Sequence, residues 1–221
     1  MGIKAGEDTF YQAKRGIVQD GLVLNLDAGV RDSYDSGTTW RDLRGGNNGT
    51  LTNMDASNFS TDNGGSLTFD GSNEYVDCGN PSISVGKLTV NAWINLNAVN
   101  IYQHVVDSSS NSWHLAILNS NRPYLYNGLA YHTGAEVLST NTWYMITGVQ
   151  GATLDIYIDG VLSQSLSSNI NVTTNNIHIG RWQSGNRNFN GKMSNISIYN
   201  RALTSDEVAR NYNATRHRFG V

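Results

Sequence analysis

Acidic side chains are the first candidates for chemistry, because two carboxylates flanking a bond can supply a general acid and a base or nucleophile. Glu74 and Asp77 stand three residues apart in a predicted strand, so their side chains point to opposite faces. Asp155 and Asp159 share a face, but Asp159 precedes a glycine in a turn sequence that already explains it. The sequence offers no carboxylate pair and therefore predicts a protein that is not an enzyme.

The sequence also gives no support for nucleophilic catalysis by a serine or cysteine activated by a histidine. The histidines are scattered at positions 104, 114, 132, 178 and 217, and the chain has no Gly-x-Ser-x-Gly elbow. His178 alternates with Ile177 and Ile179, a pattern typical of a histidine on a sheet face. Cys78 is the only cysteine and follows a predicted strand, where we expect a small buried residue rather than a nucleophile.

Aromatic, amide and guanidinium side chains gather in two segments, residues 113–132 and 179–189. Sugar sites combine aromatic faces with planar polar groups that reach hydroxyls, so these segments favour glycan binding. The candidate glycan-binding residues are Trp113, His114, Tyr124, Tyr126, Arg181, Trp182, Asn186 and Arg187. The alternative is that Trp113, Tyr124 and Tyr126 are core or cross-strand aromatics of a sheet.

Composition narrows the fold class and the partners. The chain has 221 residues, 38% hydrophobic and 15% charged, with 1 Cys and a formal net charge of −3. Asn, Ser, Thr and Gly take the place of charged residues, and they favour turns and sheet faces over helices. Without clustered Lys and Arg we expect no nucleic-acid partner. No apolar run approaches the length of a membrane span.

Alternation of apolar and polar residues predicts the elements that must position these side chains. The clearest period-two run is 88–96, and Asp159-Gly160 predicts a tight hairpin within 154–162. Thr204 and Glu207 have capping-box spacing at the start of one helix, 204–212. Further strands are expected at 21–27, 113–118, 143–149, 176–180 and 193–199. Together they predict an antiparallel β-sandwich with one short C-terminal helix.

The order of these segments resembles the concanavalin A-like jelly rolls of the laminin-G and pentraxin type. The matching stretches are 66–77, 88–94, 142–144, 154–160, 177–180 and 189–204. The resemblance implies an all-β, antiparallel jelly-roll β-sandwich. We expect it to occupy residues 21–213, between an N-terminal extension of residues 1–20 and a C-terminal tail of residues 214–221.

A narrower resemblance, to a subfamily common among tailed-phage virion proteins, lies at the ends of this interval. It rests on residues 20–29, 33–51 and 211–220. It implies a virion component such as a capsid decoration, neck or fibre-associated protein, with other virion proteins as partners. The lack of a secretory signal and of disulfides agrees with assembly in the host cytoplasm. The residues expected to dock on a partner or a second copy are Phe10, Tyr11, Arg216, Arg218 and Phe219.

The family resemblance also implies Ca²⁺ as the cofactor. Relatives hold this ion at one rim with carboxylate and backbone oxygens, and Asp70 and Asn195 stand in the corresponding segments. Many relatives carry acidic residues where this chain has Ser194 and Asn195, which implies a weaker site. The alternative at Asp70 is a bare structural turn.

These expectations combine into one hypothesis. The chain is predicted to be a non-enzymatic virion structural or decoration protein with a lectin-like fold that binds host-surface glycans. The alternatives are a free-standing carbohydrate-binding module and a glycoside hydrolase.

Overall fold

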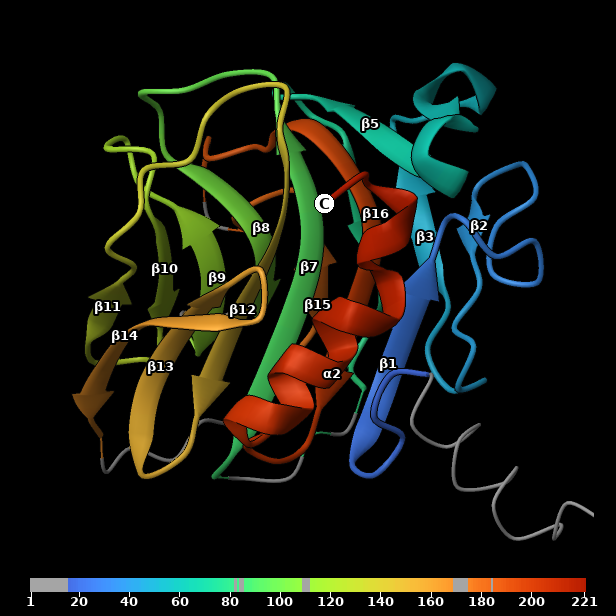
Figure 1. The fold of residues 1–221 in the computed structure, drawn as a ribbon. Helices are drawn as coiled ribbons and strands as arrows, with labels where there is room; N and C mark the ends of the chain where they lie inside the picture. Colours follow the sequence, from blue (N-terminus) through green and yellow to red (C-terminus); the bar gives the residue numbers. More distant parts are fainter. Residues whose placement is uncertain (1–15, 82, 84–85, 109–111, 169–174, 184) are drawn as a thin grey trace, which may run out of the picture.

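Two antiparallel sheets form a sandwich in the computed structural model, which describes residues 16–81, 83, 86–108, 112–168, 175–183 and 185–221 (Figure 1). In sheet A the strand order is β14 (Val161–Ser167), β13 (Thr153–Ile158), β12 (Trp143–Gln150), β7 (Leu88–Leu96), β16 (Asn190–Tyr199), β5 (Ser66–Asp70) and β4 (Phe59–Ser60), and β1 (Leu22–Asp27) also pairs with β16. In sheet B the order is β11 (Tyr131–Thr133), β10 (Pro123–Tyr126), β9 (Trp113–Ile117), β8 (Gln103–Ser108), β15 (Ile177–Ile179), β6 (Tyr75–Asp77), β3 (Gly49–Thr52) and β2 (Thr39–Trp40). This architecture confirms the predicted fold class.

The helical elements are short and lie outside the sheets. They are η1 (Ala56–Asn58), η2 (Asp62–Gly64), α2 (Ser205–Thr215) and η3 (Arg216–Arg218). Thr204 and Glu207 form the expected capping box at the start of α2. Within the described part of the chain, no helix is long and apolar enough to cross a membrane.

The main core lies between the sheets and is built from the alternate residues of each strand. Its largest members include Leu24, Trp40, Leu67, Phe69, Ile94, Trp113 and Phe189. The predicted hairpin is present, because Asp159 and Gly160 both have positive φ and join Ile158 to Val161. One face of sheet B is therefore buried in this core, and its other face points away from sheet A.

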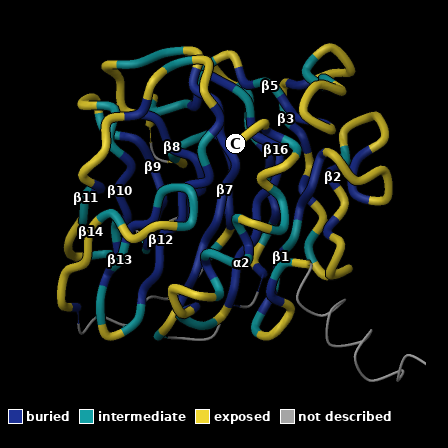
Figure 2. The backbone as a smooth tube through the Cα atoms, viewed as in Figure 1, coloured by how far each residue is buried: buried dark blue, intermediate teal, exposed yellow. Residues whose placement is uncertain are grey.

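Sheet A is covered on its outer face as well, by α2 and the segment that follows it (Figures 1 and 2). Every residue of β7 is buried, although its alternation predicts one polar face. Trp93 on the outer face is stacked between Tyr212 and Phe219, with ring centroids 5.7 and 4.0 Å away. Its Nε1 donates to Thr215 Oγ1 at 2.8 Å. Val18 belongs to the same cluster, so residues before position 21 also pack against this layer.

The C-terminal segment is fixed to β1 by a buried ion pair. Arg218 Nη1 donates to both carboxylate oxygens of Asp27, at 2.8 and 2.9 Å, and Nη2 donates to Ser194 Oγ at 2.8 Å. A Cβ at Gly29 would collide with this guanidinium, so glycine is required there. The ion pair and the Phe219 stack hold residues that follow α2 within the folded body.

This packing corrects part of the predicted docking set. Arg218 and Phe219 are largely buried within their own chain, because Asp27 and Trp93 supply the charge and the aromatic face they need. They are therefore not available to dock on another protein. Arg216 is exposed, with its guanidinium 5.7 Å from the Tyr212 ring. Phe10 and Tyr11 lie outside the described residues.

Replacing Arg218 by Ala should destabilise the protein by about 3 kcal/mol, because Asp27 would keep a buried charge without its partner. Chemical denaturation read by tryptophan fluorescence measures this loss. Arg216→Ala is the matched control, and its effect should stay within about 0.5 kcal/mol because the side chain is exposed. Equal stability of Arg218→Ala and the wild type would contradict the structural role of the ion pair.

Stability should also fall in acid because of Glu207. Arg201 donates two hydrogen bonds to its carboxylate, at 2.7 and 2.8 Å, and these lower the pKa of Glu207 from 4.5 to about 2. A lowered folded-state pKa gives stability that is complete above pH 4.5 and is lost as the pH falls toward 2. Glu207→Gln should lower the free energy of unfolding by about 2 kcal/mol at pH 7. The melting temperature of this variant should change less with pH between 4.5 and 2 than that of the wild type. Asp206→Asn, an exposed change in the same helical turn, should keep the wild-type profile.

Candidate functional site

The outer face of sheet B carries a row of polar and aromatic side chains set by strand register. Because successive residues alternate between faces, residues paired across neighbouring strands share a face. The register aligns Thr50, Asp77, His178, Asp107, His114, Tyr126 and Tyr131 in one line across the sheet. No helix of the described chain covers this face as α2 covers sheet A.

A β-bulge brings His104 into the same neighbourhood. Residues three apart on a regular strand face opposite ways, so His104 and Asp107 would lie on opposite faces of β8. The register shifts between His104 and Val106, and His104 pairs with Ala116 while Asp107 pairs with His114. The extra residue, Val105, turns His104 to the outer face.

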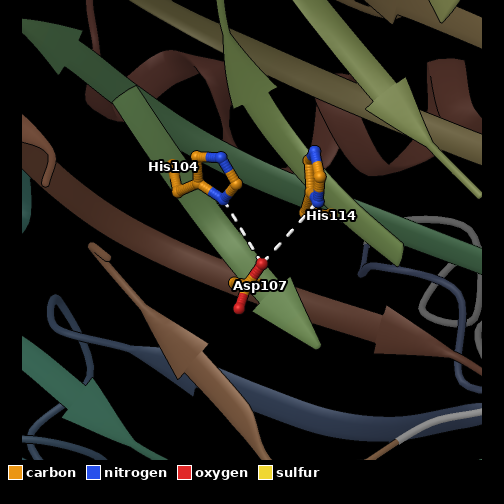
Figure 3. Close-up of side chains that lie close together, drawn as sticks. All are labelled: His104, Asp107 and His114. Atoms are coloured by element: carbon orange, nitrogen blue, oxygen red, sulfur yellow. Dashed lines mark hydrogen bonds and ion pairs between the residues drawn. The ribbon is translucent and has the colours of Figure 1, made fainter. Parts of the chain in front are cut away.

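His104, Asp107 and His114 form a compact buried cluster (Figure 3). Asp107 Oδ1 lies 3.3 Å from His104 Nδ1 and 3.7 Å from His114 Nδ1. Burial lowers the pKa of His104, and burial together with His104 and Arg187 lowers the pKa of His114 to about 2. Both imidazoles are therefore neutral at physiological pH, with one unprotonated nitrogen each.

The loop between β15 and β16 folds over this cluster, and the bulge fixes both of its ends. Gly180 N donates to Val105 O at 3.0 Å, and His104 N donates to Arg187 O at 3.1 Å. Gln183 N adds a bond of 3.3 Å to Asp107 Oδ2. The loop is thus anchored on β8 at its start, middle and end.

Stacked rings and guanidinium groups line the loop's inner side. Trp182 stacks on His104 with centroids 5.8 Å apart. The Arg187 guanidinium lies 4.7 Å from the Trp182 ring and 4.7 Å from the Tyr102 ring. Arg181 covers the Tyr75 ring at 4.0 Å. These contacts hold the planar groups in fixed orientations before any ligand arrives.

Three adjoining cavities form one concave surface, which we call the sheet B groove. The first, of about 430 Å³, is lined by Tyr102, His114, Leu118, Tyr124, Tyr126, Tyr131, Trp182 and Arg187. The second, of about 480 Å³, shares Trp182 with it and adds Arg181 and Asn186. The third, of about 410 Å³, shares Tyr102 and Arg187 with the first and Asn186 with the second. Each has the size of a small-ligand site.

The structure brings together most of the residues that the sequence predicted for glycan binding. All of them except Trp113 line the groove: His114, Tyr124, Tyr126, Arg181, Trp182, Asn186 and Arg187. The prediction that Trp113 binds a glycan is wrong, because its side chain is fully buried in the core between the sheets. Its neighbour His114 points outward, and strand alternation sends the two side chains to opposite faces.

The two predicted calcium ligands do not meet. Asp70 pairs with Asn190, whereas Asn195 pairs with Asp27, five residues and about 15 Å further along β16. Asp70 Oδ1 accepts a bond from Ser72 N at 2.7 Å, as expected for a structural turn. The Asn195 amide donates to Leu26 O at 3.1 Å. These residues do not fit one Ca²⁺ ion, so the pairing is corrected.

Tyr102 lines the groove, and His104 and Asp107 lie next to its residues Trp182 and His114, but these three were not predicted from the sequence as site residues. The histidines look scattered in the sequence, but β8 pairs with β9 across a short connection and with β15 from a distant part of the chain. His104 and Asp107 are three residues apart, and only the bulge lets them share a face. No residue type at Val105 signals that bulge.

Comparison with known proteins gives a family match and a set of similar folds. A family model described as the concanavalin A-like lectin/glucanases superfamily matches residues 70–209. No curated protein sequence matches the chain. A Trypanosoma rangeli sialidase in complex with the inhibitor DANA has a TM-score of 0.68 and 15% identity, and the match covers 89% of this chain. The chain spans about a third of that sialidase, 33%.

A second solved structure is covered over its own whole length by the match with this chain. It is domain 4 of AbnA, an extracellular GH43 arabinanase from Geobacillus stearothermophilus, in complex with arabinotriose. The TM-score is 0.68 at 15% identity, with 88% of this chain and 100% of that domain covered. At such identity the likeness concerns the fold alone.

Proposed function

Because the chain belongs to the concanavalin A-like lectin/glucanases superfamily, we propose that the sheet B groove binds an oligosaccharide and does not cleave it. One observation carries the proposal. Trp182, Tyr126 and Arg187 line one concave surface, and Asn186 places an amide in the adjoining cavities. An aromatic face packs on sugar C–H groups, while guanidinium and amide groups bond to hydroxyls.

The fixed geometry of these groups supports the proposal. Arg187 is held between Trp182 and Tyr102, so little side-chain entropy remains to be lost when a ligand binds. Trp182 rests against Gly185, where a Cβ would stand 2.8 Å from the indole ring. The complex of AbnA domain 4 with arabinotriose gives further support, since that whole domain shares the fold.

We also propose that the groove does not cleave its ligand, because the carboxylate beside the groove residue His114 is already engaged. Asp107 is almost fully buried, lies 3.3 Å from a neutral histidine and accepts a bond from the Gln183 amide. A carboxylate held in this way is not free to attack a sugar carbon or to activate water. The same reasoning favours a binding protein over the alternative of a glycoside hydrolase.

We also propose that the protein is a structural component of a tailed-phage virion, assembled in the host cytoplasm with other virion proteins as partners. The proposal rests on the resemblance of residues 20–29 and 211–220 to virion proteins. In the fold these two segments lie together, since Arg218 forms an ion pair with Asp27. A shared structural role for them agrees with the resemblance. A host-surface glycan is then the natural ligand of the groove.

A glycan array with neutral and acidic oligosaccharides, followed by calorimetry with the strongest ligand, tests the groove. Trp182→Ala and Arg187→Ala should each weaken binding at least tenfold, equivalent to about 1.4 kcal/mol. Arg44→Ala removes an exposed arginine outside the groove and should change the affinity less than twofold. Wild-type affinity in Trp182→Ala, or no array binding at all, would contradict the proposal.

Incubation with the ligands found on the array tests the absence of cleavage. We expect no release of reducing ends from any bound oligosaccharide. Turnover by the wild type that Asp107→Asn abolishes would show an enzyme instead. The thermal unfolding midpoint of each variant serves as the folding control.

Mass spectrometry of gradient-purified particles from the encoding phage tests the virion role. Peptides of this chain should be present at a fixed ratio to the major capsid protein. Their presence only in the soluble fraction of the lysate would refute this role and leave the free-standing binding module in its place.

A further inference from the structure

We propose that His104, Asp107 and His114 form a zinc site at the floor of the sheet B groove. Among the described residues, they form the group of three His, Cys, Asp or Glu side chains whose ligand atoms all lie within 4.8 Å of one another. They come from the adjacent strands β8 and β9, and Figure 3 shows both imidazoles aimed at the carboxylate. The proposal is independent of glycan binding, because it concerns the metal alone.

The spacing of the donor atoms suits four-coordinate zinc. With Zn–N and Zn–O bonds of about 2.0–2.1 Å, neighbouring donors in a tetrahedron stand about 3.3–3.4 Å apart. Asp107 Oδ1 is 3.3 Å from His104 Nδ1 and 3.7 Å from His114 Nδ1. Without a metal, the shorter contact is a hydrogen bond in which the His104 Nδ1–H donates to the Asp107 carboxylate, and zinc would replace that proton. The three ligand atoms lie within 4.8 Å of one another, and the two histidine nitrogens must also stand at the tetrahedral separation when they bind one ion.

Buried polar atoms at the cluster remain without a partner. His114 Nδ1 has no hydrogen bond although its side chain is only 9% exposed, and His104 Nε2 is likewise unpaired. An unpaired buried nitrogen costs free energy, so such an atom normally has a ligand. The His114 nitrogen points at Asp107, where zinc would bind it.

The surroundings add the features of a metal site. Imidazole binds zinc through an unprotonated nitrogen, and each histidine presents one ring nitrogen to the Asp107 carboxylate. The backbone N–H of Gln183 donates to Asp107 Oδ2 and leaves Oδ1 directed at the histidines. Such a hydrogen bond from outside the coordination shell orients a metal ligand. His114 borders the first cavity, so a fourth position is available to water or to a donor atom of a bound molecule. The Arg187 charge opposes a cation here, and the Asp107 carboxylate offsets it.

Imidazole nitrogens favour zinc over calcium, which prefers an all-oxygen shell. This choice separates the site from the calcium ion that the family resemblance implied. It also sets the expected selectivity, because the cluster should take up Zn²⁺ and Co²⁺ but not Ca²⁺.

The test uses the untagged full-length chain, stripped with EDTA and titrated with ZnCl₂ in a calorimeter, with bound metal counted by elemental mass spectrometry. We expect one zinc per chain and no heat with CaCl₂. His104→Ala, His114→Ala and Asp107→Asn should each weaken zinc binding at least tenfold. His132→Ala and His217→Ala are the matched controls and should bind zinc as the wild type does.

Cobalt substitution keeps the proposal testable if a variant fails to fold. The wild type loaded with Co²⁺ should show the intense visible absorption of four-coordinate cobalt, and Zn²⁺ should displace it. Absence of bound zinc in the wild type, or wild-type affinity in His104→Ala and His114→Ala, would overturn the site. The glycan array plays no part in these readouts, so failure of one proposal is distinct from failure of the other.

Discussion

A two-layer sandwich buries only one face of each sheet. The outer face of each sheet must therefore be either covered by other elements or left exposed to solvent and ligands. Sheet A has its outer face covered by α2 and by Phe219, which packs on Trp93. Sheet B keeps its outer face open to cavities, and the groove residues come from that face and from the loops around it. The helix therefore leaves one sheet surface for recognition.

One inserted residue gives that surface its chemistry. The bulge at Val105 turns His104 outward beside Asp107, and its carbonyl holds Gly180 at the start of the covering loop. The Trp182 ring then stacks on the same histidine. The buried cluster and the position of the loop over it thus both depend on a single irregularity in β8. His114 belongs to the cluster and also lines the groove.

Much of this fold was predictable from local pattern, and the site only in part. Asp159-Gly160 and the Thr204–Glu207 pair act within a few residues, so the hairpin and the helix start were correctly expected. Strands such as β2 and β4 hold only two residues each, too few for a periodic signal. The burial of Trp93 depends on packing by distant segments, and the meeting of His104 with His114 depends on the bulge in β8. Alternation along one strand encodes neither of them. Trp113 was misplaced because a strand aromatic looks the same on either face.

The pairing of β1 with β16 has a consequence for how the chain is made. Asp27 and Arg218 form an ion pair although 191 positions separate them in the sequence. β16 lies between β7 and β5 in the middle of sheet A. On the ribosome, β1, β5 and β7 must wait for β16 to emerge before they have their neighbour. Sheet A therefore cannot close before β16 is available, and until then the nascent chain carries exposed strand edges that favour protection by a chaperone.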